Sequence, residues 1–440
     1  MLQKVATTGV DLDSTYTQTL QRIRDQKGDR SRLGIEALMW VSHAERPLRI
    51  DELRHALAVE MGSTDLDPDN IPPQNTVLGS CLGLAVVDAE TSTVRLIHYT
   101  LQEYLSSPGI LPDAHKTLGQ TCLTYLNYKQ VMRLPAKILK FEGMLFLEYS
   151  SLYWGSHAKV DFSDHAKSLA LELLNQSGNH ISATLLIENK NIWDFHSCSL
   201  PYHLWPDLHC SSYFGIIEVV AALMERGGCD INQSDCMGFT PLMHAARQGD
   251  EGVAQLLLTR DDINPNKSDN NGGTPLWWAS FFGHSGVAKL LLARDDINPD
   301  KPDNDGDTPL WWASYHEHSG VVKLLLTRND VNPNKPDKHG ATPLAWACHS
   351  GHKGIVKLLL KRDDVNPNMP KYLDETPLWW ASFKGHRGVV RLLLAHKDID
   401  HNNIYETHKY FTSYSHHSHE VAALLQPLAT SVSELVSKQE

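Results

Sequence analysis

The sequence predicts a mostly α-helical protein, in which an N-terminal helical region with a small β-hairpin precedes a C-terminal solenoid of stacked repeats. A Thr-Pro pair that recurs every 34 residues, followed in register by a Leu-Leu-Leu triplet, predicts the solenoid. A fixed period with a fixed internal pattern is typical of one supersecondary unit that buries its apolar face only against its neighbour. The pairs begin at Thr240, Thr274, Thr308, Thr342 and Thr376, and the triplets at Leu256, Leu290, Leu324, Leu358 and Leu392.

Length and composition indicate an ordinary globular protein with several domains. The chain has 440 residues, of which 41% are hydrophobic and 21% charged, and domains usually hold ~100–200 residues. It lacks an apolar run near the ~18 residues of a membrane span, and its start lacks the apolar core of a signal peptide. Seven scattered cysteines indicate reduced thiols, so a cytoplasmic location is expected, with the nucleus as a second compartment. The net charge of -12 disfavours nucleic acid and anionic lipid as partners.

Each repeat is expected to form a helix, a turn, a second helix and an extended loop. Thr274 is placed to cap the first helix, and Pro275 suits its first turn, where a missing N–H is tolerated. Gly283 and His284 end that helix, and the leucine triplet belongs to the apolar stripe of the second helix. The Asn, Pro and Gly residues that follow supply turn chemistry.

This pattern resembles the ankyrin repeat, TPLHxA…G…LLL. The resemblance covers roughly residues 205–427 and includes a degenerate first unit at Leu208–Asn232 and a degenerate last unit at His416–Leu428. About seven units are therefore expected over residues 205–430, followed by a tail at 431–440. The resemblance implies a protein-binding stack with its ligand on the concave face and without catalytic residues or a cofactor.

The second helix departs from the ankyrin pattern at its end. The glycine that closes this helix in the family is replaced by Asp or Asn, which tolerate the left-handed conformation less well than glycine but better than other residues. We therefore expect an ankyrin stack with modified hairpin loops, in which the left-handed conformation of that glycine is taken by Asp261, Asp295, Asn329 and Asp363.

Paired tryptophans are the other departure. Three of them occupy the place of the family's histidine, and four take the next position. One interpretation is an aromatic ladder for a ligand; the favoured interpretation is packing between the first helices of adjacent repeats, because these are framework positions. The residues are Trp277, Trp311 and Trp379 in the first set and Trp278, Trp312, Trp346 and Trp380 in the second.

The first 130 residues have the pattern of a winged helix. Helices are expected at Ser14–Gln26, Gly34–Ala44, Ile50–Glu60 and Asn75–Leu84, and β-prone runs at 84–88 and 93–99 surround a polar turn. Further helices are expected from Thr100 and over Asp113–Tyr128.

The segments 37–57 and 92–107 resemble the winged helix of fungal NACHT-type signalling ATPases and that of GPI inositol-deacylase-like proteins. The resemblance implies a terminal helix of a NACHT-type module at 1–30, a winged-helix-like domain at 31–130 and a helical bridge at 131–204. It also places His98 at the nucleotide-sensing histidine of NLR-type receptors. No Gly-Lys-[Ser/Thr] phosphate cradle occurs in the chain, so His98 is expected to be a vestige. The expected function is the ligand-recognition arm of an NLR-like protein that lacks its ATPase.

Other chemistry has weaker support. The turn histidines such as His284 and His318 are expected to be structural rather than metal ligands, the cysteines lack zinc-site spacing, and no G-x-S-x-G elbow is present. No metal, cofactor or enzymatic activity is expected. Two alternatives stay open: a DNA-binding regulator acting through the winged helix, and a residual nucleotide-dependent or hydrolytic enzyme. Against the first, the candidate recognition helix Asn75–Leu84 has no Lys or Arg.

Positions that differ between near-identical repeats are candidates for ligand contact. The pair before the inter-helix turn and the tip of the extended loop change in every copy, and both sets line the concave groove of ankyrin-like stacks. Relaxed drift is the alternative, but it favours small polar residues over the aromatics and arginine found here. The predicted groove residues are Met237, Arg247, Gln248, Asn271, Phe281, Phe282, Asp305, Tyr315, His316, His339, His349, Tyr372, Phe383 and Lys384.

Because no phosphate cradle faces His98, we predict that the chain binds neither ADP nor ATP. Isothermal titration of the full chain with each nucleotide should give no specific heat. A dissociation constant below ~100 μM, which corresponds to roughly 5 kcal/mol of binding free energy, would contradict this prediction.

Overall fold

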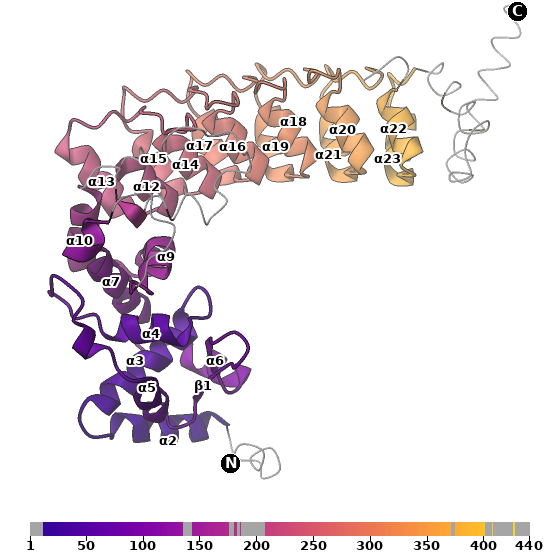
Figure 1. Ribbon diagram of the computed structural model, residues 1–440. Coiled ribbons are helices and arrows are strands. Elements are labelled where there is room, and N and C mark those ends of the chain that lie inside the picture. The colour runs from indigo at the N-terminus through magenta and orange to yellow at the C-terminus, as the bar shows by residue number, and fades with distance from the viewer. Residues whose placement is uncertain are drawn as a thin grey trace, which may run out of the picture. The chain divides into compact units, whose positions relative to one another are not determined.

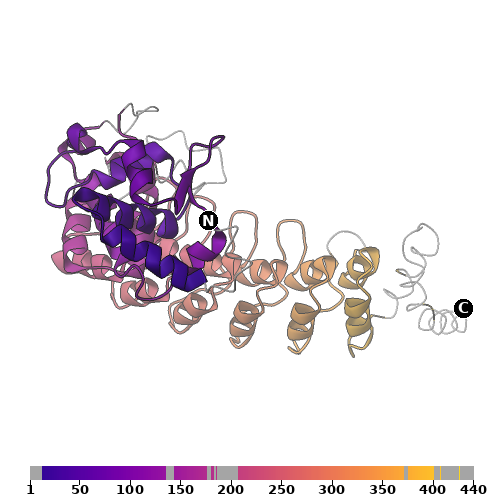
Figure 2. The ribbon, with the colours of Figure 1, turned by 90° about the horizontal axis from the view of Figure 1, so that it is seen from below.

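The computed structural model describes residues 12–134, 143–175, 180–182, 185, 207–370, 375–400, 407 and 426 (Figures 1 and 2). Contacts divide the chain into two compact units, Met1–Cys229 and Asp230–Glu440. The predicted groove residue Tyr372, the degenerate last repeat apart from residue 426, and the tail lie outside the described residues. The elements are almost all helices, which confirms the predicted fold class.

The first four helices of the described part confirm the predicted helices, with ends that differ by a few residues. Tyr16, Leu20 and Ile23 form the buried face of the first of them, as their helical spacing predicts. The helices are α2 (Leu12–Arg24), α3 (Asp29–His43), α4 (Ile50–Leu57) and α5 (Gln74–Ser80).

A two-stranded sheet follows these helices. β1 (Ala85–Val87) and β2 (Val94–Leu96) pair antiparallel, with Ala85 opposite Leu96. The N–H of Val94 also donates to the carbonyl of Leu48 at 2.8 Å, so the segment before α4 runs along β2. Three helices followed by this hairpin give the predicted winged-helix arrangement.

The described part of the N-terminal unit contains an aromatic core. Trp40 meets Phe146 edge to face at 5.3 Å, and Tyr149 stacks on Phe146 at 5.6 Å. His157 lies among these rings, and its burial lowers its pKa to about 3, so it is a neutral core residue. The other described helices of this unit are α6 (Tyr99–Leu105), α7 (Ala114–Leu126), α8 (Lys129–Met132), α9 (Leu147–Val160), α10 (Asp164–Leu174), α12 (Asp207–Phe214) and α13 (Ile217–Arg226). The last two form the degenerate first repeat.

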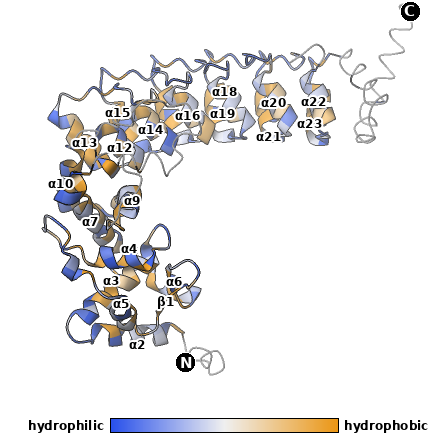
Figure 3. Cartoon of the chain, in the orientation of Figure 1, coloured by the Kyte–Doolittle hydropathy of each residue, from blue (hydrophilic) through white to orange (hydrophobic). Residues whose placement is uncertain are grey.

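The C-terminal unit is a row of helix pairs with the connecting loops along one edge (Figure 1). Hydrophobic residues concentrate on the helices, and the loops are mainly hydrophilic (Figure 3). First helices pack on first helices and second helices on second helices. The pairs are α14 (Pro241–Gln248) with α15 (Glu251–Leu257), α16 (Pro275–Phe282) with α17 (Ser285–Leu292), α18 (Pro309–Tyr315) with α19 (Ser319–Leu326), α20 (Pro343–Ser350) with α21 (Lys353–Leu359), and α22 (Pro377–Phe383) with α23 (Arg387–Leu394).

Each first helix begins and ends as its sequence predicts. The Thr274 hydroxyl accepts the N–H of Trp277 at 3.1 Å, and Pro275 occupies the first turn. Gly283 ends α16 in the left-handed region with φ 78°. A Cβ at Gly283 would lie 2.5 Å from the His318 ring, so both conformation and space require glycine there.

Histidines in the inter-helix turns join each repeat to the one before. The Nε2 atom of His284 lies 3.0 Å from the carbonyl oxygen of Arg247, and that of His318 lies 2.9 Å from the carbonyl oxygen of Phe281. His352 and His386 repeat this contact with the carbonyls of Tyr315 and His349. A structural role for the turn histidines is therefore confirmed.

The prediction of a left-handed turn at Asp261, Asp295, Asn329 and Asp363 is wrong. None of these residues has a positive φ, and the second helices end at right-handed residues such as Leu258 and Ala293. An arginine from the next repeat satisfies the terminal carbonyls instead: Arg294 donates to Leu258 O at 3.2 Å and Arg328 to Leu292 O at 2.7 Å.

One repeat lacks the turn glycine. Glu317 stands where the neighbouring repeats have Gly283 and Gly351, and it is left-handed with φ 61°. Its carboxylate lies 3.3 Å from Nδ1 of His352, a contact that compensates only in part because Glu317 is more than half exposed.

We predict that Glu317→Gly raises the free energy of unfolding by about 0.5–1 kcal/mol, because it relieves a left-handed conformation that costs roughly 1–2 kcal/mol in other residues. Urea unfolding of the full chain, followed by tryptophan fluorescence, measures the change. The reciprocal change Gly283→Ala should destabilise the chain, and a loss of stability in Glu317→Gly would contradict the assignment of strain.

Candidate protein-binding face

The structure gives the predicted groove residues three kinds of environment. One group is exposed, another is half-buried, and Met237 is buried. Met237 is therefore not available to a partner: its carbonyl accepts the N–H of Asn270, because the next repeat's loop packs against this loop tip. The exposed group is Gln248, Asn271, Phe282, Asp305, His316, His339, Phe383 and Lys384, and the half-buried group is Arg247, Phe281, Tyr315 and His349.

The first helices carry a continuous series of rings across four repeats. Trp277 contacts Trp312 of the next repeat at 5.3 Å, and Trp311 contacts Trp346 at 5.3 Å. These contacts confirm packing between adjacent first helices as a role of the tryptophans. We call the series the aromatic row; it comprises Trp277, Trp278, Phe281, Phe282, Trp311, Trp312, Tyr315, His316, Trp346, His349, Trp379, Trp380 and Phe383.

Aspartates in the extended loops fix four indoles of the row. Asp269 accepts the Nε1–H of Trp278 at 2.8 Å, and Asp337 accepts that of Trp346 at 3.1 Å. Asp303 accepts hydrogen bonds from two indole Nε1–H groups, those of Trp277 at 3.0 Å and Trp312 at 3.3 Å. These aspartates also accept backbone N–H groups of their own loops. The row is thus held in a defined arrangement before any partner binds, which lowers the entropy cost of binding.

The row is not fully covered by the protein. Phe282 is 40% exposed and Phe383 is 49% exposed. Large exposed aromatic side chains on a rigid support are typical of interface hot spots.

Arg247 already places a cation on this face. Its guanidinium carbon lies 5.4 Å from the Trp278 ring centroid and 5.8 Å from that of Phe282. Such distances fit cation–π attraction, which favours Trp and Arg. A guanidinium group of the chain itself therefore lies against the rings at this end of the row.

An acidic cluster adjoins the row at the loops 303–307 and 337–341. Burial, together with the charges of Asp303, Asp337 and Asp305, raises the pKa of Asp307 to about 7. The ammonium of Lys338 pairs with Asp305. Asp307 belongs neither to the turn pair nor to the loop tip, so it is absent from the predicted groove residues. Its position nevertheless differs between repeats, since the neighbouring copies have Gly273 and Ala341 there.

His98, which the resemblance places at a nucleotide-sensing position, does not line a pocket among the described residues of the N-terminal unit. His98 is exposed and caps α6, since its Nδ1 accepts the N–H of Thr100 at 3.3 Å. The helix α5, which corresponds to the candidate recognition helix, has no Lys or Arg.

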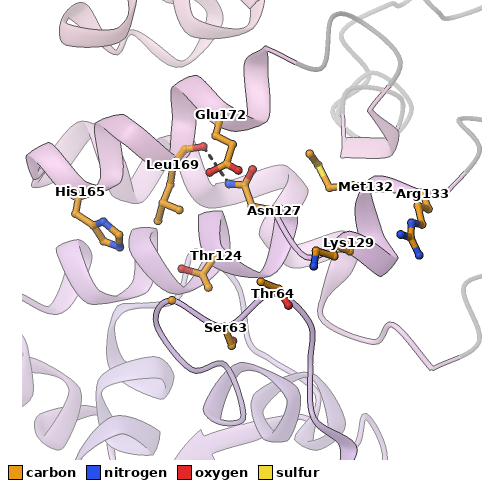
Figure 4. A pocket seen from close by; sticks show the side chains of 11 residues that line it. Ser63, Thr64, Thr124, Asn127, Lys129, Met132, Arg133, His165, Leu169 and Glu172 are labelled. Carbon is orange, nitrogen blue, oxygen red and sulfur yellow. Dashed lines mark hydrogen bonds between the residues drawn. The ribbon is translucent and has the colours of Figure 1, made fainter.

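A polar hollow of about 480 Å³ lies in the N-terminal unit between α7, α8, α10 and the loop 62–64 (Figure 4). Asn127 joins its walls by donating to Leu123 O at 2.9 Å and Leu169 O at 3.0 Å. None of the predicted site residues lines it. Within the described residues no group of three His, Cys, Asp or Glu side chains is able to hold a metal ion, and no helix of the described part is long and apolar enough to cross a membrane.

Comparison with known proteins identifies both units. The family of ankyrin repeats matches residues 171–269, 261–337 and 329–404, which together make up more than half of the chain. The chain therefore belongs to the ankyrin-repeat family. Residues 23–114 match the winged helix domain of GPI inositol-deacylase. The resemblance to ankyrin repeats and the resemblance to the winged helix of GPI inositol-deacylase are thus confirmed.

Among solved structures, the crystal structure of the ankyrin repeat domain of Bcl-3, described as a unique member of the IkappaB protein family, is 27% identical. The match covers 43% of this chain and 85% of that chain, with a TM-score of 0.40. No curated protein matches the chain.

The raised pKa of Asp307 predicts an unusual dependence of stability on pH. The folded protein holds a proton here up to about pH 7, whereas the unfolded chain releases it near pH ~4, so stability falls as pH rises between these values. Asp307→Ala should therefore raise the free energy of unfolding by about 1–2 kcal/mol at pH 8 and change it little at pH 4.

Urea unfolding of the variant at both pH values measures this effect. Asp296→Ala is the matched control, because the Asp296 carboxylate pairs with Arg294 at 2.8 Å and its loss should give no gain at pH 8. Equal effects of Asp307→Ala at both pH values would contradict the raised pKa.

Proposed function

We propose that this chain is a non-catalytic protein-binding module whose ligand lies on the concave face of the ankyrin stack, over the aromatic row. Ankyrin repeats generally bind protein partners, and membership of this family supports an interaction function. The observation that carries the placement is the aromatic row itself, which ends in the exposed rings of Phe282 and Phe383.

Within each repeat, the residues that hold the stack together differ from the predicted ligand-contact residues, which supports this placement. The threonine caps, turn glycines and turn histidines hold the stack together, and the aspartates fix the indoles. The side chains of the predicted groove residues other than Met237 do not belong to these caps, turns or aspartate–indole bonds. The half-buried rings among them pack within the aromatic row. Groove side chains other than that of Met237 are consequently free to vary with the ligand.

We further propose that the chain serves as the ligand-recognition arm of an NLR-like intracellular signalling or self/non-self recognition protein, in the cytoplasm or the nucleus. The order of a winged helix followed by ankyrin repeats supports this role, because fungal NACHT-type proteins, which the sequence resembles, have the same order. The winged helix then acts as a packing module rather than a reader of DNA, since α5 offers no cation to phosphate.

The placement predicts that Phe282→Ala combined with Phe383→Ala abolishes capture of the partner from native cell extract by the full chain. Two hot-spot rings are each worth ~2 kcal/mol or more, so the affinity should fall at least about a hundredfold. Both rings are substantially exposed, and the melting temperature should therefore change by less than a few degrees.

The matched control is Tyr99→Ala, which removes an exposed aromatic ring from the N-terminal unit. This control should capture the partner as the unaltered chain does. Undiminished capture by the double variant, or loss with Tyr99→Ala instead, would show that the partner binds elsewhere.

A further inference from the structure

The repeat that begins at Thr308 leaves polar groups without partners that its neighbours either pair or lack. Asp307 is only 8% exposed, and within the described residues its carboxylate has no hydrogen bond or ion pair. Nε1 of Trp311 is buried without a partner, whereas the equivalent atom of Trp277 donates to Asp303. Buried unpaired groups are costly. An unpaired carboxylate that is almost fully buried indicates a ligand that supplies its missing partner.

The surroundings of Asp307 define the charge of that ligand. The charged groups that face it are Asp303, Asp305, Asp337 and Lys338. Asp303 and Asp337 are already used by indoles of the row, and Lys338 pairs with Asp305. One cation thus faces four carboxylates. The missing partner of Asp307 is therefore positively charged.

The neighbouring rings favour an organic cation over a metal ion. Arg247 shows that a guanidinium group lies over Trp278 and Phe282 in the preceding part of the row. The equivalent positions in the repeat of Asp307 are Trp312 and His316, whose rings stack at 5.5 Å and of which His316 is exposed. A guanidinium suits this setting because it pairs with carboxylate in a planar fork and also stacks on aromatic rings.

We propose that the partner presents an arginine side chain, whose guanidinium pairs with Asp307 at the loops 303–307 and 337–341 while its stem lies on the aromatic row. This inference rests on the proposed function, because it specifies the chemistry of the partner on the same face. Pairing requires an ionised Asp307, so binding strengthens as pH rises towards 7 and levels off above it, with Asp303, Asp305 and Asp337 adding attraction and Lys338 opposing it.

The test is a selection of random peptides displayed on phage against the full chain at pH 8. Arginine should be enriched in the selected peptides relative to the unselected library. A synthetic selected peptide should then bind Asp307→Asn about tenfold or more weakly, because one member of a desolvated charge pair is lost. Asp307→Gly, which restores the residue of the preceding repeat at Gly273, should weaken binding as much without destabilising the fold.

Asp296→Asn is the matched control, since it removes the same charge from a surface pair with Arg294 and should leave the affinity unchanged. Peptides without enriched arginine, unaltered binding by Asp307→Asn, or displacement of the peptide by millimolar Mg²⁺ or Ca²⁺ would overturn the inference and leave the proposed function intact. Failure to select any peptide, or equal binding by the Phe282→Ala, Phe383→Ala variant, would contradict both.

Discussion

The hydrogen bond between a turn histidine and a main-chain carbonyl of the preceding repeat is the contact on which the solenoid depends. His284, His318, His352 and His386 all make it, at 2.9–3.0 Å. The imidazole lies so close to the preceding turn that a Cβ on Gly249, Gly283 or Gly351 would overlap it. The accepting carbonyls belong to the residues that begin the variable pair of each repeat. The contact that sets the spacing of the repeats therefore also fixes the backbone beneath the aromatic row.

Besides the histidine bonds, two other sets of hydrogen bonds hold the repeats and the row in place. Loop aspartates hold four of the indoles by their Nε1 atoms, and arginines that follow the second helices join successive repeats through Leu258 O and Leu292 O. Within the described residues, the Asp307 carboxylate and Nε1 of Trp311, which belong to the same repeat, have no hydrogen-bond partner. The buried, unpaired carboxylate of Asp307 is expected to reduce stability there.

Local and periodic features were predictable from the sequence because their causes lie within one repeat. The 34-residue period, the Thr-Pro helix starts and the glycine turn follow from capping and backbone preferences of adjacent residues. The end of the second helix was not predictable in this way, because Arg294 satisfies a carbonyl of the previous repeat. Likewise, Met237 is covered by the following loop, and the isolation of Asp307 depends on which neighbours its carboxylate meets in three dimensions.

The proposed function requires the partner to lie on the aromatic row of the C-terminal unit. Site-specific photo-crosslinking tests it most directly, with a photoreactive phenylalanine placed in turn at position 282 on the row and at position 323 on the exposed side of α19. Irradiation of the full chain with its captured partner should give a crosslinked product from position 282 and none from position 323. Crosslinking from position 323 alone would place the partner on the second helices and contradict the account.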